Sequence, residues 1–311
     1  MSGEKPLTLT IEEGQQMVKV ARETGRILQT GSQQRSDRTF RQACELVRNG
    51  RVGKLHTITT YLPMGRHGGP FATKEVPKGL NWDMWLGPRE MTAYVPEKCH
   101  GSFRYWYDYS GGTMTDWGAH HNDIALWALG LDRSGPVAVE GRPLVEMVPG
   151  GFTAASEYEV LYTYANGVKH HCRSISNNDP SGRAVGPHAN QRGHGVLFEG
   201  SDGWIFVSRG NKLEASSPEL LSTPLPSDAV RLAVSPGHQQ NFFECLRSRQ
   251  QPICDVEIGH RAASLCHLGV IALRTGWKLK WDPDRERFLD NAEANTWRGR
   301  PMRGPWQFDQ V

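Results

Sequence analysis

Several patterns that identify common classes of protein are missing from this sequence of 311 residues. The longest apolar runs, such as Ile124–Leu129, are far shorter than the roughly 20 residues that a membrane-spanning helix needs. No secretory signal pattern opens the chain. These absences favour a soluble protein, and we expect a cytoplasmic location, with an export signal on an upstream segment as the open alternative.

Clusters of positive charge are also missing. The 36 basic and 33 acidic residues nearly cancel, and no run of Lys and Arg is longer than a pair. A surface that binds the phosphate backbone of a nucleic acid needs a basic patch, so this composition argues against DNA or RNA as a partner.

The cysteines and histidines lack the spacing of disulfide scaffolds and metal sites. There is no C-x-x-C pair, no H-E-x-x-H motif and no Cys/His cluster, so we expect no metal site. We expect free, mostly buried thiols, which are typical of a reducing compartment. The six cysteines are Cys44, Cys99, Cys172, Cys245, Cys254 and Cys266.

The start of the chain has the pattern of the end of an α/β unit. Residues 10–24 predict an amphipathic helix with a threonine cap, an acidic first turn and a stop at Gly25. The apolar run over residues 26–32 ends in glycine and predicts a buried strand of a parallel sheet. A second helix over residues 37–49 is expected to bridge to the rest of the chain.

From residue 54 onward the pattern favours strands, with helices between them. Asn166-Gly167 predicts a tight hairpin turn, and residues 63–79 and 177–195 predict long irregular loops. We therefore predict an α+β fold in which helices flank a large, mostly antiparallel, open sheet. The predicted strands cover residues 55–62, 137–145, 157–164, 168–174, 196–199 and 204–207, and the predicted helices cover residues 115–129, 238–249 and 260–275.

Asp116 and His120 are the first candidates for chemistry. They are four residues apart, which places them on one face of a helix. A carboxylate beside an imidazole can orient it and raise its basicity, as proton abstraction from a hydroxyl requires. Two other interpretations stay open: a charge at a helix start with an ordinary polar neighbour, or metal ligands together with His121.

A lysine and two aromatic segments are further candidates. Glu4-Lys5-Pro6 precedes the first helix, where a lysine can point into a crevice at the carboxyl end of a strand. Residues 81–85 and 103–109 combine aromatic side chains with Arg104 and hydroxyls, as sugar-binding clefts do, although such clusters are as typical of a hydrophobic core.

Taken together, these motifs resemble the Gfo/Idh/MocA family of oxidoreductases. The resemblance is carried by residues 4–11 (EKPLTLTI), 30–35 (TGSQQR), 82–87 (WDMWLG), 111–120 (GGTMTDWGAH), 241–249 and 254–257, and so covers essentially the whole chain. It implies a C-terminal domain whose open sheet supports a homo-oligomer. It also implies NAD- or NADP-dependent oxidation or reduction at a carbinol of a sugar, glycoside or cyclitol.

The resemblance also implies roles for individual residues. Lys5, Asp116 and His120 match the catalytic set, in which His120 is the general acid/base and Asp116 orients the substrate or the imidazole. The residues expected near the cofactor are Glu4, Lys5, Gln33 and Arg35, and those expected to contact the substrate are Trp82, Arg104, Tyr107 and His121.

One family feature is missing. No G-x-G-x-x-G/A turn, which presents backbone amides to the pyrophosphate of a dinucleotide, is present. We therefore expect residues 1–36 to be the last helix and strand of a truncated Rossmann domain, with on the order of a hundred residues absent, and residues 37–311 to be the substrate-binding and oligomerisation domain. The alternatives are a binding or assembly module without cofactor, and an enzyme for redox-independent acid/base chemistry on a keto-sugar.

Overall fold

The first helix and strands form a small parallel unit in the computed structural model, which describes residues 1–174 and 194–308. Helix α1 (Ile11–Glu23) connects strand β1 (Ser2–Gly3) to strand β2 (Gln29–Thr30), and the two strands pair in parallel. Thr10 and Glu13 form a reciprocal capping box at the start of α1, which confirms the helix predicted there. The strand predicted over residues 26–32 is parallel as expected but shorter, because only two of its residues pair with β1.

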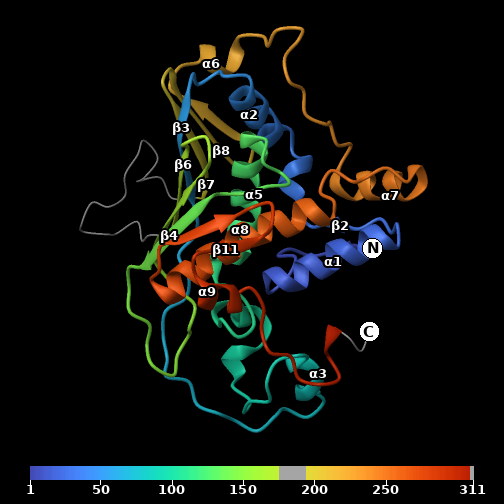
Figure 1. Cartoon of the computed structure of the whole chain (residues 1–311), viewed down its shortest axis with the longest axis vertical. Coiled ribbons are helices and arrows are strands. Elements are labelled where there is room, and N and C mark those ends of the chain that lie inside the picture. Colours follow the sequence, from blue (N-terminus) through green and yellow to red (C-terminus); the bar gives the residue numbers. More distant parts are fainter. Residues whose placement is uncertain (175–193, 309–311) are drawn as a thin grey trace.

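The rest of the chain alternates helices with the strands of one large sheet (Figure 1). The helical segments are η1 (Gln33–Ser36), α2 (Arg38–Arg48), α3 (Trp82–Leu86), η2 (Pro96–Lys98), η3 (His100–Tyr105), α4 (Thr113–Asp116), α5 (Gly118–Leu129), α6 (Glu219–Ser222), α7 (His238–Ser248), α8 (Val256–Thr275) and α9 (Ala292–Thr296). The strands are β3 (Leu55–Tyr61), β4 (Ala138–Pro143), β5 (Tyr158–Thr163), β6 (Lys169–Ser174), β7 (Gly195–Gly200), β8 (Gly203–Ser208), β9 (Lys212–Ala215), β10 (Leu279–Asp282) and β11 (Arg287–Leu289).

The large sheet has nine strands in the order β11-β10-β4-β5-β6-β3-β7-β8-β9. All neighbours are antiparallel except β3 and β6, which confirms the mostly antiparallel sheet. The hairpin predicted at Asn166-Gly167 connects β5 to β6, and Gly167 has the positive φ of 85° that such a turn requires. The irregular loop predicted over residues 63–79 is confirmed, whereas most of the loop predicted over residues 177–195 lies outside the described residues.

The core lies between the sheet and the helices α2, α5 and α8, which Figure 1 shows on the same side of the sheet. In β5, the side chains of Tyr158, Val160 and Tyr162 are buried, while the residues between them are only half-buried, as the period of a strand dictates. Helix α8 is buried along most of its length, so it forms a central core element rather than a surface helix. It begins at Val256, four residues before the predicted start, because Asp255 caps it.

The single helix predicted over residues 115–129 is wrong in one respect, because the structure divides it into α4 and α5 at Trp117. The backbone of Trp117 keeps helical angles, but its carbonyl accepts from the amides of both His120 and His121 at 3.1 Å. The bond to His120 spans three residues rather than four, so the helix tightens locally at this point.

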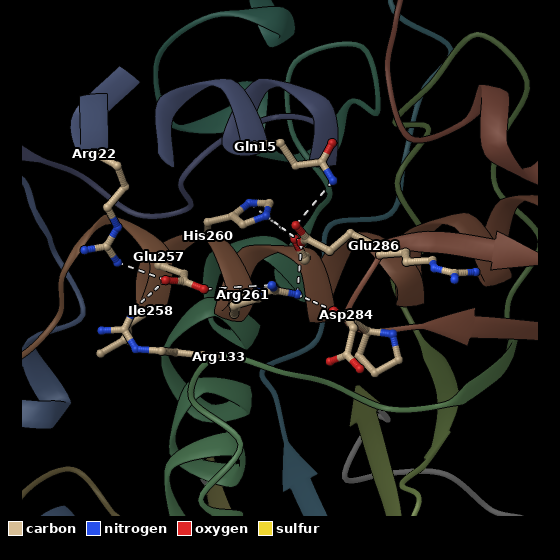
Figure 2. A network of polar contacts seen from close by, with 12 residues as sticks. Gln15, Arg22, Arg133, Glu257, Ile258, His260, Arg261, Asp284 and Glu286 are labelled. Atoms are coloured by element: carbon tan, nitrogen blue, oxygen red, sulfur yellow. Dashed lines mark hydrogen bonds and ion pairs between the residues drawn. The ribbon is translucent and has the colours of Figure 1, made fainter. Parts of the chain in front are cut away.

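A polar network docks α1 onto α8 (Figure 2). Glu286 lies at its centre: His260 Nε2 of α8 is 2.6 Å from Glu286 Oε1, and the Gln15 amide of α1 donates to Glu286 Oε2 at 3.3 Å. At the other end of α1, the Arg22 guanidinium donates to the Glu257 carboxylate at 2.9 Å. These contacts attach the small parallel unit to the large sheet, while the domain boundary at residue 36 stays a prediction.

The sequence-based prediction for the thiols is confirmed, since all six cysteines are free and buried. Across residues 1–174 and 194–308, none of the helices combines the length and apolar character needed to cross a membrane.

One histidine of the large sheet is buried in the core. His170 of β6 is fully buried, with its Nε2 atom 2.7 Å from the Thr60 hydroxyl and its Nδ1 atom 3.2 Å from the Tyr164 hydroxyl. Burial lowers the pKa of His170 from 6.5 to about 3. The imidazole is therefore neutral in the folded protein throughout the physiological range.

We predict that acid destabilises the fold through His170. Because the pKa of this imidazole is lower in the folded state, the unfolded state binds the extra proton below the unfolded value. Its contribution to the free energy of unfolding should therefore fall by about 1.5 kcal/mol between about pH 6.5 and pH 5. Urea unfolding at a series of pH values measures this slope.

The control is the exposed His67. The slope should become shallower in His170→Gln and stay as in the wild type in His67→Gln. Equal slopes in all three proteins would contradict the prediction.

Candidate active site

The contact between Lys5 and Asp116 brings the two ends of the candidate site together. Lys5 follows β1, and Asp116 ends α4. The Lys5 ammonium contacts the Asp116 carboxylate and donates to the Asp116 carbonyl oxygen at 2.9 Å. Both side chains are only partly buried, at 15% and 22% exposure, so the pair remains accessible to a small molecule.

Lys5 lines two cavities. The first, of about 600 Å³, is lined by Gln33 and His120 together with Lys5. The second, of about 420 Å³, is lined by Arg104 and Asp116 together with Lys5. Glu4 lines both cavities as well. The structure therefore brings together the three residues expected to be catalytic and three of the four expected near a cofactor, with Lys5 belonging to both sets.

His120 is neutral in this setting. Its side chain lines the first cavity, and its Nδ1 atom is buried without a hydrogen-bond partner in the described part of the chain. Burial lowers the pKa of His120 to about 3, and the positive charges of Lys5 and Arg209 lower it further against the opposing effect of Asp116. Asp116 does raise the basicity of His120, as the sequence suggests, but burial of the imidazole outweighs this effect, and the Asp116 carboxylate also contacts Lys5.

Arg35 is placed away from both cavities, in a buried ion pair. Its guanidinium donates to both carboxylate oxygens of Asp123, at 2.8 and 2.7 Å, and lies 2.7 Å from Asp132. Burial opposes its charge, but the nearby carboxylates raise the pKa of Arg35 above its usual value. Arg35 therefore joins the segment that follows β2 to α5, one turn beyond His120.

The residues expected to contact the substrate are dispersed. Arg104 lines the second cavity, with its Nε atom 3.5 Å from the Asp116 carboxylate. Tyr107 lines a separate cavity of about 280 Å³. Trp82 lines neither cavity beside Lys5 and stacks on Trp85 at 4.8 Å between ring centroids, within a small aromatic cluster.

His121 lies behind the wall of the first cavity. It is fully buried, with its Nε2 atom 2.8 Å from His194 Nδ1 and its Nδ1 atom 3.2 Å from the Gln34 amide nitrogen. Its ring stacks on Trp117. Burial lowers the pKa of His121 well below its ordinary value. These contacts support the cavity wall rather than line the cavity.

Sequence reasoning missed Arg209, which also lines the first cavity. It begins the turn between β8 and β9, where Gly210 and Asn211 have positive φ angles of 78° and 59°. A Gly-Asn pair after the strand predicted at residues 204–207 is a hairpin signal. That signal could have predicted the turn, though not the cavity beside it.

The described residues offer a dinucleotide the ends of two short parallel strands but no glycine-rich turn. Glu4 and Gln33 follow β1 and β2, at the carboxyl ends of parallel strands where such folds bind ligands. These strands have two residues each, and none of the described residues forms a glycine-rich turn that would bind a pyrophosphate. In the same ranges, no group of three or more metal-ligating side chains comes together.

Comparison with known proteins defines the class. The family model described as the oxidoreductase family, C-terminal alpha/beta domain, of Gfo/Idh/MocA proteins matches residues 64–308. The chain belongs to this family. No curated protein sequence matches it.

Solved structures share the fold at low sequence identity. An aldose-aldose oxidoreductase from Caulobacter crescentus, complexed with glycerol, is 18% identical with a TM-score of 0.61, and the match covers 90% of this chain and 71% of that one. The WlbA dehydrogenase from Bordetella pertussis, in complex with NADH and UDP-GlcNAcA, is 17% identical with a TM-score of 0.59 and the same coverage. GenD2 from gentamicin A biosynthesis, in complex with NAD, is 16% identical with a TM-score of 0.58, again covering 90% and 71%.

We predict that Arg35→Met severely destabilises the protein. The substitution leaves Asp123 buried with its main counter-charge removed, which should lower the free energy of unfolding by about 3–5 kcal/mol. Denaturant unfolding followed by tryptophan fluorescence measures the loss. The exposed Arg38→Met is the matched control and should have little effect.

A double variant separates the loss of the ion pair from general misfolding. Arg35→Met combined with Asp123→Leu removes both charges and should recover much of the stability. A single Arg35→Met variant as stable as the control would show that the pair does not fix this part of the fold.

Proposed function

We propose that this chain carries the substrate-binding and acid/base part of an NAD- or NADP-dependent oxidoreductase that acts at a carbinol of a sugar, glycoside or cyclitol. The observation that carries the proposal is the contact of Lys5 with Asp116, where Lys5 lines one cavity together with a neutral His120 and a second cavity together with Asp116. Family membership and the fold shared with NADH- and sugar-nucleotide-bound dehydrogenases support it.

In this proposal, His120 accepts the proton of the substrate hydroxyl. A neutral imidazole has one nitrogen free to accept, and Nδ1 is buried, so Nε2 is the atom that receives the proton. The Lys5 ammonium donates to the same hydroxyl oxygen and stabilises the negative charge that develops there. Asp116 holds Lys5 in place. Acceptance of the hydride from the carbinol carbon is the chemistry that NAD or NADP supplies when bound.

The proposal includes a homo-oligomer in the cytoplasm. On the face of β5 turned away from the helices, Glu159, Leu161 and Thr163 are half-buried, which leaves an area that another subunit can cover. The free thiols support a reducing compartment.

We predict that His120→Gln lowers kcat/KM by about two to four orders of magnitude, because the hydroxyl proton loses its acceptor. The assay follows NADH or NADPH formation with a panel of aldoses, glycosides and inositols. His67→Gln is the control, since His67 is exposed and lines neither cavity beside Lys5.

Two results would contradict the proposal. One is a His120→Gln variant with the activity of the control. The other is a folded wild-type chain that neither oxidises any carbinol of the panel with NAD or NADP nor enhances NADH fluorescence.

A further inference from the structure

Arg209 differs from the other two cations of the candidate site in having no carboxylate partner. Lys5 and Arg104 both form ion pairs with Asp116. Arg209 forms no ion pair with any acidic side chain of residues 1–174 and 194–308, although it lines the same cavity as Lys5 and His120. Its charge is therefore available to a ligand.

The Arg209 side chain is held by neutral groups. Its Nε atom donates to the Gln34 amide oxygen at 3.3 Å, and its guanidinium lies 4.7 Å from the centre of the Trp117 ring. The two terminal nitrogens form no hydrogen bond within the described part of the chain. Because Nε and the flat face of the guanidinium hold it in place, the two terminal nitrogens remain free, among the described residues, to donate. Their spacing matches that of two oxygens of a carboxylate or phosphate.

Neither of the two acidic residues that line this cavity forms an ion pair with Arg209. Asp37 caps α2 and accepts from the amides of Thr39 and Phe40 at 2.8 and 3.2 Å. Glu4 follows β1 beside Lys5 and forms no ion pair with Arg209. Partial burial lowers the pKa of Arg209, and the Asp116 carboxylate, which forms no ion pair with Arg209, offsets this effect only in part. A ligand anion bound directly to the guanidinium would complete the compensation of its charge.

We propose that Arg209 selects an anionic substrate, a monosaccharide whose carboxylate or phosphate binds Arg209 while one of its hydroxyls contacts Lys5 and His120. The cavity of about 600 Å³ is lined by all three residues, and its size falls within that of ordinary small-molecule sites. The hydroxyl contact rests on the proposed function, whereas binding of the anion to Arg209 does not.

The test is calorimetric binding of glucuronate, glucose 6-phosphate and glucose to the full chain without nucleotide. At least one anionic sugar should bind about ten to a hundred times more tightly than glucose, as expected for hydrogen bonds to a charged group. Comparison of the two anions tells a carboxylate site from a phosphate site. Arg209→Gln should reduce the affinity for that anion to the level of glucose, and Arg209→Lys should retain part of the preference.

The matched control is Arg247→Gln, on the exposed surface of α7, which should bind like the wild type. Thermal unfolding of Arg209→Gln at the wild-type midpoint excludes a general folding defect. The proposal is overturned if neither anion binds better than glucose, or if the preference survives in a folded Arg209→Gln variant.

Failure of this inference is distinguishable from failure of the proposed function. Arg209-dependent binding of an anionic sugar, without NAD- or NADP-dependent oxidation, would leave the anion site in place and remove the dehydrogenase proposal. Oxidation of neutral sugars through His120, without any preference for anions, would do the reverse.

Discussion

The buried ion pair between Arg35 and Asp123 fixes the geometry on which the candidate site depends. Two desolvated charges are tolerated in a protein interior only when their geometry is good and the remaining polar atoms find partners. Here the contact is bidentate, and Asp132 supplies a second carboxylate. Because Asp123 lies one turn beyond His120 and Arg35 lies just beyond Gln33, the pair sets the distance between the two sides of the first cavity.

The protonation state of His120 is determined more by burial than by the charge of Asp116. Asp116 is shared by Lys5 and Arg104, so it compensates positive charge and leaves the imidazole unpaired. Desolvation then determines the protonation state of His120, which is neutral although a carboxylate lies four residues away in the sequence. Helical spacing alone therefore overestimates how strongly such a carboxylate acts on its neighbour.

Much of the fold could be predicted from the sequence, because it is encoded in local periodicity. The alternation in β5, the turn at Gly167 and the capping box at Thr10 each depend on residues close together in the chain. The short strands β9, β10 and β11 were not predicted, since three or four residues carry too little periodicity.

Only part of the candidate site could be predicted from the sequence, because its contacts are between segments far apart in the chain. Lys5 and Asp116 are 111 positions apart, and only the family resemblance brought them together in advance. Arg35 was expected near the cofactor only because its segment matches the family motif, and local sequence does not indicate that its side chain turns inward to Asp123. The place of Arg209 beside the cavity could not be predicted, because it depends on the hairpin of β8 and β9, and β9 was not predicted.

The turn at residues 209–211 has an evolutionary consequence. The residues that would handle the proton lie on helices and strand ends held by one buried and one partly buried ion pair, where substitutions tend to disturb folding. Arg209 begins an exposed hairpin turn whose backbone is set by Gly210 and Asn211. Exchange of that one side chain would leave the sheet register unchanged, so, under the two proposals, ligand preference can diverge between relatives while the chemistry and the fold are inherited intact.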